Sequence, residues 1–249
     1  MDLSASLAPW SRWLRACLAP PCCELCLNLV PAPPELCPAC RLQLRPLRPE
    51  RCAQCALPFP AGSTAGHRCE ECLVAPPSFQ RVDAAYEFQG SAAGLLHRLK
   101  FGGQLHVLPP LLRGALPSFR EVLREFSPQA LLPVPLGRWR RLRRGFNQSY
   151  VLAESLLRSV GESLPLLLAA RRRATAPQAR QGRAARLRAM REVFHISDRA
   201  AIRGRRLLVF DDVMTTGATV EALSKSLLQA GAEAVQVYVL ARTARNRDG

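Results

Sequence analysis

The sequence predicts an α/β fold in which a doubly wound parallel sheet is preceded by a small N-terminal double zinc ribbon. Apolar runs of strand length alternate with helical patterns after residue 77, as they do where helices cover both faces of a parallel sheet. All ten cysteines lie before residue 73, and eight of them form four C-x-x-C pairs. We therefore expect an N-terminal helix at residues 1–21, the double zinc ribbon at 22–75 and the α/β domain at 78–249.

The composition indicates a basic protein that stays inside the cell. The net charge is +16 over 249 residues, and nearly all of the positive charge comes from arginine. A charge of this size favours a polyanionic partner. No apolar run approaches the ~18 residues of a membrane span, and Arg12 and Arg15 interrupt the apolar segment that a secretory signal needs. We therefore expect a cytoplasmic protein with reduced cysteines.

Residues 1–21 should form an amphipathic helix that stops at a proline pair. The apolar side chains recur at helical spacing, at Leu3, Leu7, Trp10, Leu14 and Leu18. The favoured interpretation is a helix docked on the rest of the protein, and the alternative is an anchor at a membrane surface.

The cysteine spacing predicts two structural zinc ions. The pairs are Cys23/Cys26, Cys37/Cys40, Cys52/Cys55 and Cys69/Cys72. A C-x-x-C turn places two thiolates on one metal ion, and two such turns complete a closed tetrahedral site. Hairpin-sized gaps join the first pair to the second and the third to the fourth, which predicts two ribbons in tandem. Disulfides would suit a secreted chain, and a thioredoxin-like redox site would use one pair.

Three other residues in this region have alternative roles. Cys22 competes with Cys23 as a ligand, although it would leave three intervening residues instead of two. His67 is a possible ligand, but the tip of a hairpin is the favoured place for it. Cys17 should be a buried free thiol.

The α/β domain should begin with a strand at 82–88 and a helix that is capped by Ser91 and runs to Lys100. The next expected elements are a helix at 108–116, a strand at 130–134, a helix at 147–160 and strands at 164–168, 206–210 and 234–240.

The most informative stretch surrounds the strand at 206–210. Its four apolar residues are followed by Asp211 and Asp212, and then by the loop Thr215-Thr216-Gly217-Ala218-Thr219, which opens a helix that stops at Gly231. A strand, a tight loop and a helix N-terminus make an anion site of backbone N–H groups. Paired carboxylates beside a phosphate are reasonable if they face the two hydroxyls of a ribose, with Mg²⁺ nearby. This pattern therefore favours a phosphorylated sugar.

These residues resemble the phosphoribosyl pyrophosphate (PRPP) motif of type I phosphoribosyltransferases: an apolar strand, Asp-Asp, an apolar pair and Thr-Thr-Gly-x-Thr. The resemblance implies that Asp211 and Asp212, as the catalytic pair, position the ribose hydroxyls. It also implies that Thr215, Thr216, Gly217, Ala218 and Thr219 hold the 5′-phosphate.

A second candidate for chemistry is the loop at 135–148, which follows the strand at 130–134 and should share its rim of the sheet. Its basic and aromatic residues are Arg138, Trp139, Arg140, Arg141, Arg143 and Arg144, ahead of Phe146. Together with Lys100, they suit a pyrophosphate or a nucleic-acid backbone with bases stacked on the rings. The alternative is a solvated basic loop.

The whole arrangement resembles the ComF family of bacterial competence proteins, including the GntX-type members. The resemblance covers the four C-x-x-C pairs, Leu99-Lys100-Phe101, the run R-R-G-F-N-Q at 143–148 and the Asp-Asp loop. The segment at 171–190 departs from the family pattern, because Gln181 stands for a leucine and Ala189 for an asparagine. We expect this arginine-rich segment to be a mobile flap over the sugar-phosphate site, and the alternative is a surface that binds a nucleic-acid strand.

Two classes of function follow. The ComF resemblance implies a protein that binds PRPP or a nucleotide together with single-stranded DNA, and that serves DNA uptake and utilisation beside other DNA-uptake proteins. The alternative is an active phosphoribosyltransferase that uses Mg²⁺-PRPP and an unidentified nitrogenous acceptor. Nothing in the sequence identifies a pocket for a base, so the first class is favoured.

Overall fold

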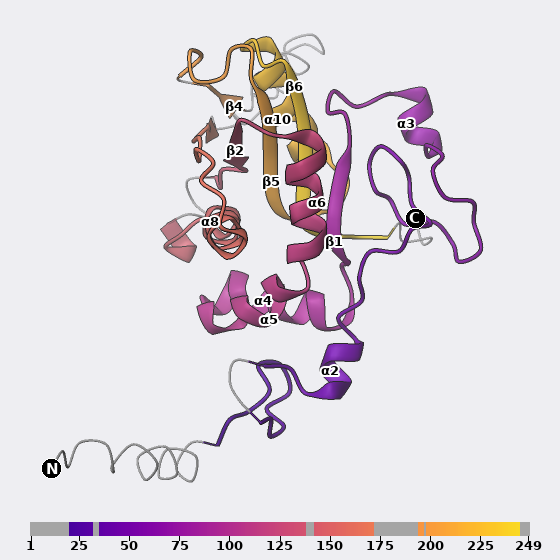
Figure 1. The fold of residues 1–249 in the computed structure, drawn as a ribbon, viewed down its shortest axis with the longest axis vertical. Helices are drawn as coiled ribbons and strands as arrows, with labels where there is room; N and C mark the ends of the chain where they lie inside the picture. The colour runs from indigo at the N-terminus through magenta and orange to yellow at the C-terminus, as the bar shows by residue number, and fades with distance from the viewer. Residues whose placement is uncertain (1–19, 32–34, 138–141, 172–193, 197, 245–249) are drawn as a thin grey trace, which may run out of the picture.

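The computed structural model describes residues 20–31, 35–137, 142–171, 194–196 and 198–244. A four-stranded sheet in the order β1-β6-β5-β2 lies at its centre (Figure 1). The strands are β1 (Val82–Glu87), β6 (Ala234–Arg242), β5 (Arg206–Met214) and β2 (Ala130–Pro133). Every neighbouring pair is parallel, so the carboxyl ends of all four strands lie at one edge. The predicted α/β fold with a parallel sheet is therefore confirmed.

Helices cover both faces of the sheet. One face carries α4 (Gly90–Gly102), the 3₁₀ turn η1 (Leu105–Val107), α5 (Leu108–Arg113), α6 (Leu116–Phe126) and α8 (Gln148–Val160), and the other carries α10 (Ala218–Gln229). In β5, Leu208 and Phe210 join the core on the first face, whereas Leu207 and Val209 join the core beneath α10. Because successive side chains of a strand point to opposite faces, a central parallel strand is apolar throughout.

Two cysteine modules flank the sheet. The first cysteine module (residues 22–43) includes α2 (Pro38–Leu42) and packs on the core around α4. The second cysteine module (residues 51–75) includes α3 (Glu70–Val74), lies beside β1 in Figure 1, and packs on the opposite core. The connection between them runs antiparallel to β1, where the Leu47 N–H donates to the Ala85 carbonyl at 2.9 Å. This connection covers the outer edge of β1, which would otherwise expose unpaired backbone groups.

Three predicted elements differ from the structure. The strand expected at 164–168 is reduced to a single parallel bridge between Leu166 and Leu131. The helix expected at 108–116 is interrupted at Gly114, where the Tyr86 hydroxyl packs so closely against the backbone that a Cβ would collide with it. Ser91 does not cap α4, because Gln89 is the N-cap residue and Ser91 lies inside the helix.

Helix α6 is absent from the predicted elements, although its buried residues Phe119, Val122 and Phe126 follow helical spacing. The predicted N-terminal helix falls almost wholly on residues 1–19, outside the described residues, as does Cys17. Two short strands, β3 (Ala170–Arg171) and β4 (Phe194–His195), pair antiparallel on either side of the undescribed segment 172–193. Within the described residues, no helix combines the length and the hydropathy that crossing a membrane requires.

Candidate functional site

The acidic pair lies inside β5 and not after it. The ladder between β5 and β6 continues through Asp211 and Val213 to Met214, four residues beyond the expected end of the strand. Asp212 is buried, and Asp211 is partly buried. The strand therefore holds both carboxylates on a fixed backbone at the carboxyl edge of the sheet.

Helix α8 fixes the orientation of Asp211. The Ser149 hydroxyl donates to Asp211 Oδ1 at 2.9 Å, and the Asp212 N–H donates to the same oxygen at 2.9 Å. Ser149 is placed by Asn147, the N-cap residue of α8, whose side chain accepts from the Ser149 N–H at 3.2 Å and donates to the Val134 carbonyl at 3.1 Å. The two hydrogen bonds of the Asn147 side chain thus fix the start of α8 against the chain that leaves β2. They place the Ser149 hydroxyl beside the Asp211 carboxylate.

The environment of Asp211 favours its neutral form. Burial raises the pKa of the Asp211 carboxyl, and the negative charge of Asp212 raises it further. The hydrogen bonds from Ser149 and the Asp212 N–H, and the positive charge of Lys100, lower the pKa, and the net result is a pKa of about 7. A carboxyl with this pKa changes its charge near neutral pH, as groups at functional sites often do.

Lys100 reaches the same site from the last turn of α4. Its Nζ lies 3.0 Å from Asp212 Oδ2, and both side chains are mostly buried. The other carboxylate oxygen of Asp212 accepts from the Val213 N–H at 2.6 Å. The structure therefore brings Lys100 and the acidic pair together from opposite ends of the domain sequence.

The loop from Thr215 to Thr219 lies open beside the acidic pair. Thr215 and Thr216 are exposed, and Gly217 is the N-cap residue of α10 with a φ of 81°. A side chain at Gly217 would be strained at this φ, and its Cβ would lie 2.5 Å from the Met214 methyl group. The loop exposes threonine hydroxyls at the N-terminus of a helix, which is the arrangement that binds anions.

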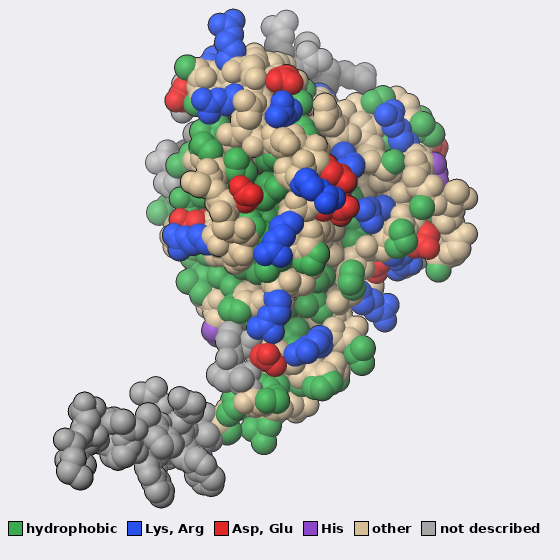
Figure 2. Space-filling view, viewed as in Figure 1, with side chains coloured by type: hydrophobic (Ala, Val, Ile, Leu, Met, Phe, Trp, Pro, Cys, Tyr) green, Lys and Arg blue, Asp and Glu red, His purple; other side chains and the backbone are tan. Residues whose placement is uncertain are grey.

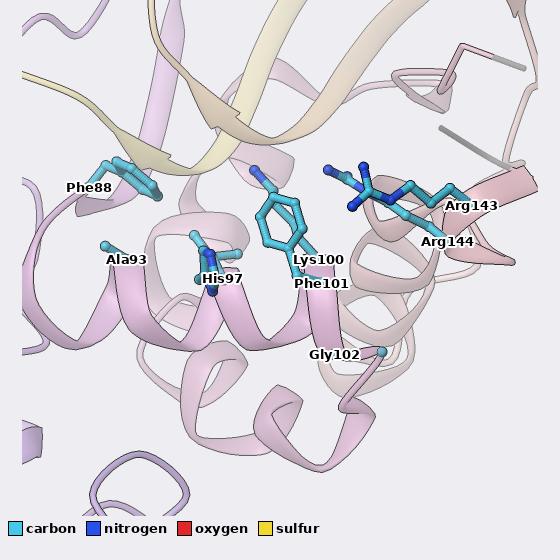
Figure 3. Close-up of a pocket in the computed structure, with 10 residues that line it drawn as sticks. Phe88, Ala93, His97, Lys100, Phe101, Gly102, Arg143 and Arg144 are labelled. Carbon is cyan, nitrogen blue, oxygen red and sulfur yellow. The ribbon is translucent and has the colours of Figure 1, made fainter. Parts of the chain in front are cut away.

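A cavity of about 880 Å³ separates α4 from the loop that precedes α8. Lys100 and Phe101 extend from α4 on the side of Arg143 and Arg144, with His97 one turn back along the helix and Phe88 just before the helix begins (Figure 3). The Arg144 guanidinium carbon lies 5.2 Å from the centre of the Phe101 ring, and the His97 ring lies 4.5 Å from it. The cavity thus combines cations with exposed rings.

The other predicted rim residues, Arg138, Trp139, Arg140 and Arg141, lie outside the described residues. On the face shown in Figure 2, Lys and Arg side chains are scattered and have Asp and Glu among them. Charge alone therefore does not mark a single path for a polyanion on that face.

The eight predicted cysteine ligands form two clusters. One holds Cys23, Cys26, Cys37 and Cys40, the other holds Cys52, Cys55, Cys69 and Cys72, and within each cluster all sulfur atoms lie within 4.8 Å of one another. The distance from Cys26 Sγ to Cys37 Sγ is 3.5 Å, and that from Cys55 Sγ to Cys69 Sγ is 3.7 Å. A tetrahedral zinc with Zn–S bonds of about 2.3 Å requires sulfurs roughly 3.8 Å apart. Each cluster therefore has the dimensions of a structural metal site.

The competing residues take other roles. Cys22 is not in the cluster, and its sulfur donates to the Pro20 carbonyl at 3.2 Å. His67 stacks on Phe59 with ring centres 4.3 Å apart. Cys23, and not Cys22, therefore belongs to the first cluster, and the second cluster consists of cysteines alone.

Backbone N–H groups favour the thiolate at one cysteine of each cluster. Burial raises the pKa of the Cys52 thiol, but N–H donors from Cys55, Cys69 and Gln54 outweigh it and lower the pKa to about 7. Burial and backbone donors act in the same opposing way on Cys23, and its pKa is lowered to about 6. Burial raises the pKa of the Cys40, Cys55 and Cys72 thiols instead. Thiolates are the form that binds metal, so these N–H donors prepare one ligand in each cluster.

Two contributors to the site are missing from the sequence-based list. Ser149 could have been suspected from its place in the first turn of a helix that follows a strand. Arg242 ends β6 and is buried, with hydrogen bonds to the Met214 and Thr215 carbonyls. Its only signal in the sequence is a charge at the end of an apolar run.

Comparison with known proteins gives a consistent result. The family described as "Phosphoribosyl transferase domain" matches residues 90–248. The DNA utilization protein YhgH of Escherichia coli is 34% identical over 194 residues, which cover 76% of this chain and 83% of that protein. Competence protein F of Haemophilus influenzae is 29% identical, covering 86% and 93%, and competence protein ComFC of Bacillus subtilis is 25% identical, covering 84% and 85%.

Proposed function

The chain belongs to the ComF/YhgH family of competence and DNA-utilisation proteins with a phosphoribosyl transferase domain, and from that premise we propose that it binds a phosphoribosyl ligand and single-stranded DNA. The ligand is PRPP or a nucleotide. The role is intracellular DNA uptake and utilisation, as in natural competence, in the cytoplasm and beside other DNA-uptake proteins.

The observation that carries the proposal is the open Thr215–Thr219 loop beside an oriented acidic pair. The loop offers hydroxyls and a helix N-terminus to a 5′-phosphate. Asp211 and Asp212 accept the ribose hydroxyls, with Ser149 and Lys100 holding the two carboxylates in place. Carboxylate oxygens also suit the Mg²⁺ that accompanies PRPP.

The cavity between α4 and α8 supports the DNA part of the proposal. Lys100, Arg143 and Arg144 supply positive charge, and Phe101 and His97 supply exposed rings on the same wall. Cations that follow a backbone and rings that stack with bases are the features of sequence-tolerant single-strand binding. The sequence adds Arg138, Trp139, Arg140 and Arg141 to this rim.

Zinc is the metal that we propose for both cysteine clusters. Four thiolates in a closed tetrahedron are typical of structural zinc. The sulfur separations and the N–H donors described above support this choice.

Calorimetry with Mg²⁺-PRPP tests the sugar-phosphate site. The double variant Asp211→Asn with Asp212→Asn should abolish binding, because the ribose hydroxyls lose both charged acceptors. The control is Glu121→Gln with Glu162→Gln, which removes the same charge from two exposed positions and should bind normally. Unchanged binding in the aspartate variant would show that the acidic pair does not hold the ligand.

The same samples distinguish the alternative function. An active phosphoribosyltransferase releases pyrophosphate from PRPP once an acceptor is present, whereas a protein that only binds PRPP does not. Measurable pyrophosphate release that is lost in the aspartate variant would therefore favour the enzyme.

A further inference from the structure

Arg242 joins the second cysteine module to the phosphate loop. It is only 4% exposed, at the end of the central strand β6. Its Nε donates to the Cys55 carbonyl at 3.0 Å, and its Nη1 donates to the Met214 carbonyl at 3.1 Å and to the Thr215 carbonyl. One guanidinium thus links the backbone of a metal ligand to the first residues of the loop.

These hydrogen bonds of Arg242 bear on phosphate binding because they fix the direction of two loop carbonyl groups. An anion is bound by N–H groups and is repelled by carbonyl oxygens that turn towards it. Arg242 holds the Met214 and Thr215 carbonyls towards its own guanidinium. It also places a positive charge behind the loop, where a desolvated charge interacts more strongly than at the surface.

The second cysteine module also forms a wall of the space in front of the loop. A cavity of about 770 Å³ is lined by Thr215 and Thr216 of the loop, by Arg242, and by Leu57 and Glu71 of the module. Leu57 and the module's cysteines belong to the same buried core as the apolar face of α10, the helix that the loop opens. A structural change in the second cysteine module can therefore alter the loop by two routes, the Arg242 guanidinium and the shared buried core.

We propose that the second cysteine module is part of the phosphate site, so that metal in its cluster and a phosphorylated ligand at the Thr215 loop stabilise each other. Arg242 is the positioning residue of this coupling, which rests on the proposed function. The first cysteine module is an internal control, because its described side-chain hydrogen bonds to the domain run to α4 and α5 and not to the Thr215 loop. Ser91 Oγ donates to the Cys40 carbonyl at 2.7 Å, and Arg98 donates to the Glu24 and Leu25 carbonyls.

The test measures alkylation of each cysteine in the zinc-loaded full chain, challenged with a chelator that takes zinc and not Mg²⁺. Linkage requires that Mg²⁺-PRPP raise the zinc affinity of the coupled cluster by the factor by which zinc favours PRPP. With zinc at equilibrium between protein and chelator, the alkylation rate of a cluster follows its zinc-free fraction and reports this affinity. We expect alkylation of Cys52, Cys55, Cys69 and Cys72 to slow by at least about 5-fold, the lower end of typical couplings. Alkylation of the first cluster should change by less than about 2-fold.

Two variants locate the coupling. Arg242→Lys keeps the charge but loses the forked geometry, so it should remove the protection of the second cluster and weaken Mg²⁺-PRPP binding by about 5-fold or more. Ser91→Ala should speed alkylation of the first cluster and leave both PRPP affinity and protection of the second cluster unchanged.

The outcomes separate the two proposals. Equal protection of both clusters in protein that binds Mg²⁺-PRPP would overturn the coupling and leave the proposed function standing. Absence of binding of both Mg²⁺-PRPP and a nucleoside 5′-monophosphate to the wild-type protein would overturn the proposed function and this inference with it. The wild-type comparison needs no variant, so it decides the matter even if Arg242→Lys does not fold.

Discussion

Replacing Asp211 by asparagine should stabilise the folded protein while it weakens ligand binding. Burial and the charge of Asp212 raise the pKa of Asp211 from an ordinary 3.8 to about 7, which means that the folded protein disfavours this carboxylate. Asparagine has nearly the same shape and no charge. Its oxygen still accepts hydrogen bonds from the Ser149 hydroxyl and the Asp212 N–H, which now meet Asp211 Oδ1 at 2.9 Å each.

The size of the effect follows from the pKa. A pKa of about 7 in place of 3.8 corresponds to at most about 4 kcal/mol of stability lost by the charged form. The net pKa already contains the hydrogen bonds that favour the carboxylate, so their loss is not subtracted a second time. We therefore expect the free energy of unfolding to rise by up to about 4 kcal/mol at pH 8, and the thermal midpoint to rise by up to roughly 8–16 °C.

The pH dependence of stability follows from the raised pKa of Asp211. Between pH 3.8 and about 7 the folded protein binds a proton at Asp211 that the unfolded chain has released, so this group makes wild-type stability fall as pH rises through that window. The asparagine variant lacks this slope. Its advantage should be full above pH 7, less than half as large at pH 5, and absent near pH 4.

Thermal unfolding at pH 5 and pH 8 measures this difference, with Asp212→Asn as the matched comparison. Asp212 pairs with Lys100 at 3.0 Å, so its replacement leaves a mostly buried ammonium without its partner and should lower the midpoint. A lower midpoint for Asp211→Asn at pH 8, or the same advantage at both pH values, would refute the reasoning.

Two further predictions concern DNA and metal. Arg143→Ala with Arg144→Ala should flatten the log–log salt dependence of single-stranded DNA binding by about 1.4 if both contact phosphates. The control is Arg41→Ala with Arg113→Ala, two exposed arginines that pair with Glu35 and do not line the cavity, and it should leave the slope unchanged. Salt-independent binding would count against the DNA role. Elemental analysis should find two zinc ions per chain. Cys69→Ser should lower the thermal midpoint of the whole chain, because the cysteines of the second cluster share a buried core with the sheet. An unaltered main unfolding transition would show that the second cysteine module unfolds alone.

The parts of the fold that the sequence predicts are those in which burial alone sets the residue pattern. Central strands such as β5 and β6 are apolar because both faces are covered, and each begins a few residues after a glycine, Gly204 and Gly231. The end of β5 was missed because two carboxylates interrupt the apolar run, although the ladder continues through them to Met214. Helix α6 is not predicted because the apolar run at 108–116 indicates one helix. The close approach of Tyr86 to Gly114, at the junction of α5 and α6, is a tertiary contact that no local pattern reveals.

The candidate site was predictable only in its local parts. The Thr215–Thr219 loop and the C-x-x-C pairs are continuous motifs whose chemistry depends on near neighbours in sequence. The ion pair of Lys100 with Asp212 and the hydrogen bond from Arg242 to Cys55, 187 residues apart, depend on how elements pack. No spacing rule reaches across such separations, so the residues that orient the site came from the structure.

The relation between the cysteine modules and the domain is the point at which the structure changes the expectation most. The sequence suggests that loss of a zinc ligand would unfold only residues 22–73, since a small segment without a core depends on its metal. In the structure, Cys23, Cys37 and Cys40 lie in the core beneath α4, and the four cysteines of the second cluster lie in the core beneath α10. The first module thus extends the core around α4, and the second extends the core beneath α10. Loss of metal from either module therefore exposes apolar surface of the α/β domain as well as of the module, so it should lower the stability of both.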